Sequence, residues 1–183
     1  ADDYGHFSVD APVNGNVETA SEGTLTVMVG GEDQAVAMAH PILSKLGATV
    51  IHCGGPGSGQ AAKICNNLIL GISMIGVSEA FVLASHLGLS AEALFEVASA
   101  SSGQCWSLTH HCPVPGPVPS SPANNDYKAV FASALMFKDL KLAQETALEL
   151  GAVTPLASQA AQLFALHNRS GNGARDFSSI IEL

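Results

Sequence analysis

The stretch that decides the fold runs from Gly57 to Asn67 and reads Gly-Ser-Gly-Gln-Ala-Ala-Lys-Ile-Cys-Asn-Asn. Its glycines follow a β-rich segment, let the backbone turn tightly before a helix begins, and are expected to allow a ligand to approach closely. The segment Gln60 to Leu87 is apolar on nearly all sides, as expected of a helix at the centre of a bundle. Lys63 and Asn67 are spaced i, i+4, so their side chains share one face. We therefore predict a buried helix that presents two polar side chains to a cleft.

The spacing supports more than one interpretation of Lys63. A lysine on an otherwise apolar helix loses hydration unless it meets a partner or a cleft, which indicates a functional role. A lysine near a helix start can also reach water along its own stem, with Asn67 bonded locally, and from spacing alone this is the more common arrangement. The free N–H groups at the helix start favour an anion such as a carboxylate or phosphate. A binding module for small anions is therefore one hypothesis for the chain.

The residues before this helix carry strand and helix signals in turn. A short strand is expected over residues 7–13, ending in the polar turn Asn14-Gly15-Asn16. A second strand is expected over residues 24–29 and a third over residues 49–53. Between them a helix is expected from Glu32 to Leu46, with one apolar face made of Val36, Ala39, Leu43 and Leu46. Three strands and one helix are too little to form a closed sheet alone, so this part is predicted to be a small α/β element.

The remainder of the chain reads as helical. Helices are expected over residues 91–98 after the cap Ser90, from Phe131 to Leu150, and from Pro155 to His167, with a short last element beginning at Asp176. Prolines between Gly103 and Asn125 exclude a regular helix in that stretch. The expected fold class is therefore mainly α, with the small α/β element at its N-terminus.

Composition narrows the classes of partner. The chain has 183 residues, of which 47% are apolar and only 13% are charged, so we expect it to cover apolar surface against another protein chain. Its net charge of −9 argues against a nucleic-acid partner, since no basic stripe replaces counterions. The uncharged run from Ile64 to Ser78 is about 15 residues long, short of a membrane span. A buried core helix is therefore predicted there, and no membrane span.

The cysteines and histidines suggest no metal site. Cys65 lies in an apolar run and is expected to be a small buried hydrophobic residue rather than half of a disulfide. One loop gathers four possible ligands, Cys105, His110, His111 and Cys112. Their spacing matches no familiar zinc pattern, so we predict that the chain holds no metal.

Several motifs together resemble those of the 3-hydroxyisobutyrate dehydrogenases, within the β-hydroxyacid dehydrogenase family. Gly57–Asn67 resembles the catalytic helix of that family, and Asp10–Asn16 is similar to its substrate turn, usually D-A-P-V-S-G-G. Ser101–Ser107 and Pro113–Gly116 resemble its S-S-G-x-C-W-S and N-P-V-P-G motifs, and Met136–Leu140 resembles its M-x-K-D-L. The motifs are collinear, and the resemblance covers nearly the whole chain.

The resemblance implies oxidation of a 3-hydroxy acid by NAD in valine breakdown, in the mitochondrial matrix. It places the proton-transferring role on Lys63, with Asn67 orienting the substrate and Phe131 forming an apolar wall. A cationic lysine can hold the hydroxyl oxygen and stabilise the charge that develops as hydride leaves the carbon.

The resemblance also implies a substrate-binding turn and a cofactor contact. Asn14, Gly15 and Asn16 form the turn, where Gly15 would approach the substrate carboxylate, and Lys138 and Asp139 would line the cleft towards the cofactor. The turn departs from the family pattern, because asparagine stands at 14 in place of serine and at 16 in place of the second glycine. A side chain at position 16 would occupy space that a carboxylate needs.

By the same resemblance, residues 1–56 are the tail of a nucleotide-binding α/β domain and residues 57–183 are a helical domain for substrate binding and oligomerisation. The sequence has no G-x-G-x-x-G after an N-terminal strand, so the first dinucleotide-binding units are not found in it. One hypothesis is a catalytic half that needs a separate nucleotide-binding chain and does not turn over alone. The other is a non-catalytic structural subunit of a larger assembly, derived from this family.

Overall fold

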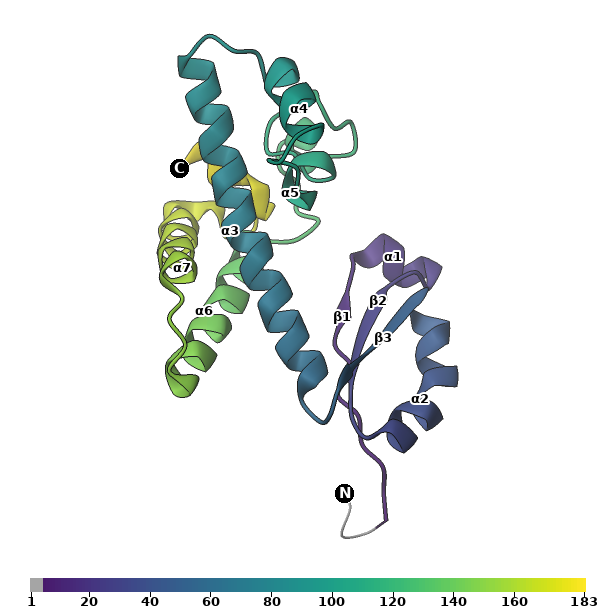
Figure 1. The fold of residues 1–183 in the computed structure, drawn as a ribbon. Helices are drawn as coiled ribbons and strands as arrows, with labels where there is room; N and C mark the ends of the chain where they lie inside the picture. The colour runs from purple at the N-terminus through teal and green to yellow at the C-terminus, as the bar shows by residue number, and fades with distance from the viewer. Residues whose placement is uncertain (1–4) are drawn as a thin grey trace. The chain divides into compact units, whose positions relative to one another are not determined.

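A computed structural model of the protein describes residues 5–183. The chain forms two compact units, one ending at Asn66 and the other beginning at Asn67. The first holds a three-stranded sheet, and the second is built from helices (Figure 1). The long helix α3 (Ser58–His86) belongs to both, because the boundary falls within it. This arrangement confirms the mainly α fold with a small α/β part at the N-terminus.

The sheet of the first unit has the order β1-β2-β3, with β1 (Val13–Asn14) antiparallel and β3 (Thr49–Gly54) parallel to the central β2 (Thr26–Gly30). Helix α2 (Asp33–Leu46) joins the two parallel strands (Figure 1). Because β2 lies between two neighbours, its residues from Val27 to Gly30 are buried, whereas β3 forms an exposed edge. The second and third strands predicted from the sequence are confirmed.

Most of the apolar face predicted for α2 packs into the core of this unit. Val36 is buried and Leu43 packs against the same cluster as Val27 and Val29. Leu46, expected on that face, is instead 51% exposed, because it is the last residue of the helix and does not belong to the cluster.

The first predicted strand is shorter than expected, and it is followed by a helix that the sequence analysis did not predict. Only Val13 and Asn14 join the ladder, while Pro12, which has no N–H, contributes its carbonyl to Met28 N at 2.9 Å. The turn then leads directly into α1 (Val17–Glu22), whose N-cap is Asn16 in a capping box. Between residue 5 and the start of α3, the first unit therefore has two helices where the sequence predicted one.

The second unit confirms the predicted helices. The long helix α3 starts two residues earlier than expected, and α7 has the predicted bounds. One prediction is wrong in part: a one-turn helix lies inside the proline-rich stretch, before the first proline. The elements after α3 are α4 (Ala91–Ser99), α5 (Trp106–Thr109), the 3-10 helix η2 (Pro122–Asn125), α6 (Ser133–Leu150), α7 (Pro155–His167), the π-helix η3 (Asn168–Asn172) and the 3-10 helix η4 (Phe177–Glu182).

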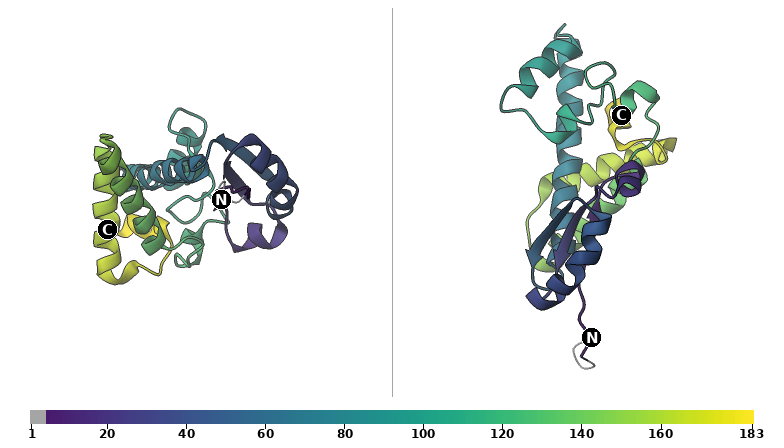
Figure 2. Two further views of the ribbon diagram at one scale, coloured as in Figure 1. Left: turned by 90° about the horizontal axis from the view of Figure 1, so that it is seen from below. Right: turned by 90° about the vertical axis from the view of Figure 1, so that its right-hand side faces the viewer.

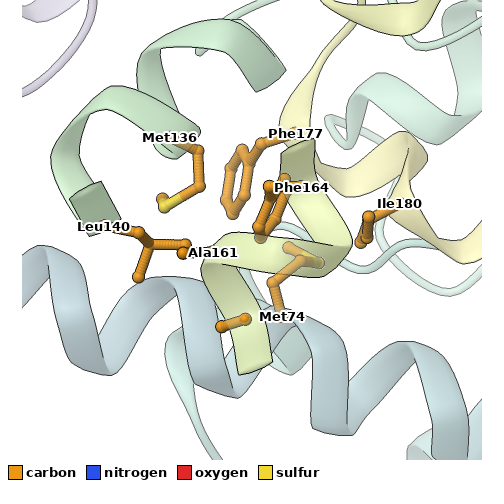
Figure 3. Packing of buried hydrophobic residues seen from close by; sticks show 8 residues of the cluster. Met74, Met136, Leu140, Ala161, Phe164, Phe177 and Ile180 are labelled. Atoms are coloured by element: carbon orange, nitrogen blue, oxygen red, sulfur yellow. The ribbon is translucent and has the colours of Figure 1, made fainter. Parts of the chain in front are cut away.

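The main core of the second unit lies where α6 and α7, which run side by side, meet α3 and η4 (Figures 1 and 2). Met74 of α3, Met136 of α6, Phe164 of α7 and Phe177 of η4 are all fully or almost fully buried and face one another (Figure 3). A second cluster around Phe81 joins α3 to the loop that contains α5. The C-terminal residues are therefore an integral part of this core.

The prediction of a buried α3 is confirmed only in part, because Met74 and Phe81 are buried but much of the helix is not. Only 33% of its most apolar 18-residue window is buried, and Ile69 and Leu83 are more than half exposed. Cys65, expected inside, is also exposed. By length and composition α3 could cross a membrane, but core helices of ordinary proteins pass the same test, so this is weak evidence for a span. The apolar composition of α3 thus exceeds what its own chain covers.

Two glycines of α3 allow a matched test of its packing. A Cβ at Gly71 would lie 2.9 Å from Leu140 Cδ2 and 3.0 Å from Met136 Sδ, whereas a Cβ at Gly76 meets nothing within 4 Å. Gly71→Ala is expected to destabilise the protein by about 1–3 kcal/mol through overpacking. Gly76→Ala is expected to stabilise it by about 0.5–1 kcal/mol, because alanine favours the helix. Urea unfolding followed by circular dichroism measures both, and equal effects would contradict this packing.

Candidate functional site

The start of α3 is bound by a side chain from far away in the sequence. Asp10 accepts a hydrogen bond from Gly57 N at 2.6 Å and another from Gln60 N at 2.8 Å, one on each carboxylate oxygen. Burial alone would raise the pKa of Asp10, but the backbone N–H groups of Gly57, Gln60 and Gly59 lower it overall. The anion expected at this helix start is therefore the protein's own carboxylate, which overturns the hypothesis of a small-anion binding module at this position.

The glycines of this region make room for Asp10. A Cβ at Gly30 would come within 2.3 Å of Asp10 Oδ1, and a Cβ at Gly59 within 2.8 Å of Asp10 Oδ2 and 2.4 Å of Met28 O. From the sequence, the glycines around position 57 were expected to let a ligand approach closely. In the structure, Gly59 instead permits close approach of the helix start to the end of β2 and to Asp10.

Lys63 lies one turn further along α3, and its side chain reaches the predicted substrate turn. Its Nζ donates a hydrogen bond to Val13 O at 2.8 Å, and the side chain is half-buried. Asn14 and Gly15, which follow Val13, are exposed. The structure thus brings the predicted proton-transferring residue to the predicted substrate turn. The alternative of a lysine that extends into water with no specific partner does not describe it.

Asn16, one of the two altered positions of the turn, and its neighbour Gly15 both have structural roles. Asn16 caps α1, since its Oδ1 accepts from Thr19 N at 2.9 Å and its own N–H donates to Thr19 Oγ1 at 2.8 Å. Gly15 has a φ of +147°, and a Cβ there would lie 2.4 Å from Thr19 Oγ1 and 2.5 Å from Leu25 Cδ2. The Asn16 side chain is therefore engaged in the cap, and Gly15 is required by its neighbours.

The second unit brings three other predicted site residues together. Asn67 is 5% exposed, and its Nδ2 donates to Asp139 Oδ2 at 2.7 Å. The other carboxylate oxygen of Asp139 lies 3.0 Å from Lys138 Nζ, whose side chain is 69% exposed. Because a carboxylate only accepts, this contact fixes which end of the Asn67 amide faces Asp139. Asp139 thus orients a buried amide and an exposed ammonium at once.

Phe131 is placed by a buried pair that the sequence reading missed. Phe131 N and Val130 N both donate to Asp176 Oδ2 at 3.0 Å, and His111 Nε2 lies 2.7 Å from Asp176 Oδ1. Asp176 is fully buried. The Phe131 ring meets the Phe177 ring edge-on at 5.7 Å. The structure therefore places Phe131 against the C-terminal segment rather than in the hydrogen-bonded group around Asp139.

The pKa of Asp176 reflects this environment. Burial alone would raise it, but hydrogen bonds from His111, Phe131 and Ser178 lower it overall. The capping role of Asp176 could be predicted from the sequence, because an aspartate at the start of a helical segment is a typical N-cap. In the structure its side chain accepts a hydrogen bond from Ser178 N. Nothing in the spacing connects it to His111, 65 residues earlier.

The loop that holds several histidines and cysteines has the features of a packed segment. Across residues 5–183, no three His, Cys, Asp or Glu side chains group as metal ligands do. His111 stacks between Trp106 and Phe177 at ring distances of 5.1 and 4.9 Å. Burial raises the pKa of the Cys112 thiol. Cys112 is therefore a protonated core residue, which agrees with its place beside Phe81.

A cavity in the second unit is separate from these residues. It has a volume of about 560 Å³. Its lining is mostly apolar and comes from α3, α7 and the C-terminal segment that contains η4: Ile75, Ser78, Glu79, Val82, Leu83, His86, Leu163, Ile180, Ile181 and Leu183. None of the predicted site residues lines it, so the cavity is not the predicted substrate site.

Comparison with known proteins gives a consistent family. Residues 57–183 match the model described as NAD-binding of NADP-dependent 3-hydroxyisobutyrate dehydrogenase, and residues 1–55 match the NAD binding domain of 6-phosphogluconate dehydrogenase. A probable 3-hydroxyisobutyrate dehydrogenase of Mycobacterium tuberculosis is 48% identical over 181 residues, which are 99% of this chain and 61% of the relative. A probable mitochondrial 3-hydroxyisobutyrate dehydrogenase of Arabidopsis thaliana is 49% identical over 94% of this chain and 50% of its own length.

A solved structure agrees with these relatives. The structure of M. tuberculosis 3-hydroxyisobutyrate dehydrogenase with L-serine has a TM-score of 0.95 and 47% identity, and it matches 99% of this chain and 62% of that chain. The present chain thus corresponds to the C-terminal part of longer relatives. The plant relative is named mitochondrial, whereas the mycobacterial relatives are bacterial proteins. The chain belongs to the 3-hydroxyisobutyrate dehydrogenase family.

Proposed function

We propose that this chain is the catalytic part of a dehydrogenase that oxidises a 3-hydroxy carboxylate, with NAD or NADP as hydride acceptor. The observation that carries the proposal is the contact of Lys63 Nζ with Val13 O at 2.8 Å. It sets the amine of a partly buried lysine beside the turn that the resemblance assigns to the substrate. Asn67, Lys138 and Asp139, the other polar residues implied by the resemblance, are linked by hydrogen bonds in the second unit.

Each of these residues has a role that its surroundings support. Lys63 holds the substrate hydroxyl oxygen and takes part in moving its proton as the carbonyl forms. Asn67, fixed by Asp139, orients the substrate. The substrate carboxylate lies at the exposed residues Asn14 and Gly15, and Asn16, the N-cap of α1, completes the turn. Phe131 supplies an apolar wall for the substrate.

The substrate class is a short 3-hydroxy acid, for which 3-hydroxyisobutyrate is the first compound to test. The solved M. tuberculosis relative is described together with L-serine, which also carries a hydroxyl group on the carbon β to its carboxylate. Valine breakdown is the metabolic setting that goes with this substrate. A mitochondrial matrix location follows if the chain comes from a eukaryote, as the name of the A. thaliana relative suggests.

The cofactor is bound jointly with residues outside the present sequence. NAD or NADP, when bound, supplies the hydride acceptor. The ammonium of Lys138 is largely exposed and paired with Asp139, and we propose that both face the cofactor. The sheet offers an edge strand on either side, β1 and β3, where further strands of a nucleotide-binding sheet can add. Residues 1–56 would then be the tail of that domain, and residues 57–183 the substrate and oligomerisation domain.

A chimaera tests this function. The N-terminal part of the M. tuberculosis relative that this chain does not match is joined ahead of residue 1, and reduction of NAD or NADP is followed with 3-hydroxyisobutyrate. The chimaera is expected to turn over the substrate, and the chain alone is expected to show no turnover. A folded chimaera that binds the cofactor but gives no turnover would exclude the catalytic role.

That negative outcome would favour a non-catalytic structural subunit. The specific observation behind this alternative is the apolar surface that α3 leaves uncovered, including Ile69, Leu83 and the cavity of about 560 Å³. Surfaces of this kind mark contacts between protein chains. We propose in either case that the helical unit associates with a second copy of the chain, and sedimentation of the isolated chain reports on it.

A further inference from the structure

We infer that Asp10 is a positioning residue for Lys63: it fixes the first turn of α3 to the segment Asp10–Asn14 and so sets the ammonium of Lys63 at the carbonyl of Val13. The inference rests on the proposed function for its catalytic meaning. Its geometry lies entirely within the first unit and is independent of substrate or cofactor.

Asp10 is fixed through its main chain as well as its side chain. Its N–H donates to Gly30 O at 3.0 Å and its carbonyl accepts from Gly30 N at 2.8 Å, as an isolated antiparallel bridge. Its carboxylate accepts from Gly57 N and Gln60 N. One residue thus joins the end of β2 to the first turn of α3 by four hydrogen bonds.

Three residues further along, the same segment meets α3 a second time. Val13 lies in β1, opposite Val27 of β2, and its carbonyl accepts from Lys63 Nζ. Asp10 and Val13 therefore contact α3 at its start and one turn later. Because the strand side of both contacts is fixed by the sheet, the position of the helix start decides whether the ammonium of Lys63 reaches Val13 O.

The chemistry of the contact requires a carboxylate. Both oxygens of Asp10 accept from backbone donors, so an asparagine would place its own NH₂ against one N–H group. A serine would offer one acceptor and no charge. Asp33, in the first turn of α2, has a fully exposed side chain and is a matched control within the same unit.

The experiment measures the accessibility of Lys63 in the chain itself. Folded protein is labelled with a trace of acetic anhydride, and mass spectrometry gives the extent of acetylation of Lys63 relative to the exposed Lys141. In Asp10→Asn this ratio is expected to rise about threefold to tenfold, as for loss of one hydrogen bond. In Asp10→Ser it is expected to rise less, and in Asp33→Asn it is expected to stay at the wild-type value.

Each outcome decides the inference. A Lys63 ratio that stays at the wild-type value in folded Asp10→Asn would overturn it, because a cap that only stabilises the helix changes stability alone. If Asp10→Asn does not fold, Asp10→Ser takes its place. Unfolding of both, while Asp33→Asn stays folded, would show that Asp10 supports the whole unit rather than Lys63, and would also overturn it. Since labelling needs no substrate, a chimaera without turnover refutes the proposed function and leaves this result intact.

Discussion

Lys63→Met in the chimaera is expected to lower kcat by about 10²–10⁴-fold, the usual contribution of a positioned acid–base group. Methionine has a similar length and no donor, so both the contact with Val13 O and the interaction with the substrate hydroxyl are lost. KM is expected to change far less, since Asn67 and the substrate turn remain. Steady-state kinetics with 3-hydroxyisobutyrate give both constants.

The control for this substitution is Lys141→Met. Lys141 is exposed, and its Nζ lies 3.5 Å from Glu145 in an i, i+4 pair, so its loss is expected to leave kcat within about twofold. Equal kcat values for the Lys63 and Lys141 variants would show that Lys63 is not a catalytic residue. Circular dichroism shows whether each variant keeps its helices.

Asp176→Ala is expected to lower the free energy of unfolding of the second unit by about 3–5 kcal/mol, as when one partner of a buried pair is removed. The substitution removes a fully buried carboxylate and leaves His111, Val130 N and Phe131 N without this acceptor. Urea unfolding by circular dichroism measures the loss. The matched control is Glu149→Ala, an exposed acidic residue of the same unit, which is expected to change stability by less than about 0.5 kcal/mol.

The same residue gives stability a defined pH dependence. The pKa of Asp176 is lowered in the folded state, so its contribution is complete above the unfolded value of 3.8 and is lost as pH falls through the lower folded pKa. The difference in stability between wild type and Asp176→Ala is therefore expected to shrink as pH falls below about 4. A difference that grows on acidification would contradict an ionised Asp176.

Local signals in the sequence predicted most of the fold. Periodicity and caps placed α2, α4 and α7 correctly, because each is defined by residues within a few positions of one another. The helix α1 was missed although Asn16 and Thr19 have capping-box spacing. The burial of α3 was overestimated, since an apolar pattern shows that a face avoids water but does not show which chain covers it.

The site was predictable only in part, for a similar reason. The motifs predicted Lys63, Asn67, Lys138 and Asp139 as candidate site residues, but the contacts of Lys63 with Val13 and of Asn67 with Asp139 join positions that are distant in sequence. Asp10 acts 47 and 50 residues away. No periodicity connects such positions, so the roles of Asp10 and of the His111–Asp176 pair required the tertiary structure.

The close approach at Gly30, Gly59 and Asp10 also constrains how this family can diverge. A lineage that loses the acidic residue relieves only some of the crowding, because a methyl group at Gly59 would still lie 2.4 Å from Met28 O, and one at Gly30 would still lie 2.8 Å from Gly59 N. The order of substitutions is therefore constrained. Asp10 can be replaced while Gly30 and Gly59 remain, but neither glycine can be replaced before Asp10. In a copy that has given up catalysis, the two glycines should be the last traces of this motif to disappear.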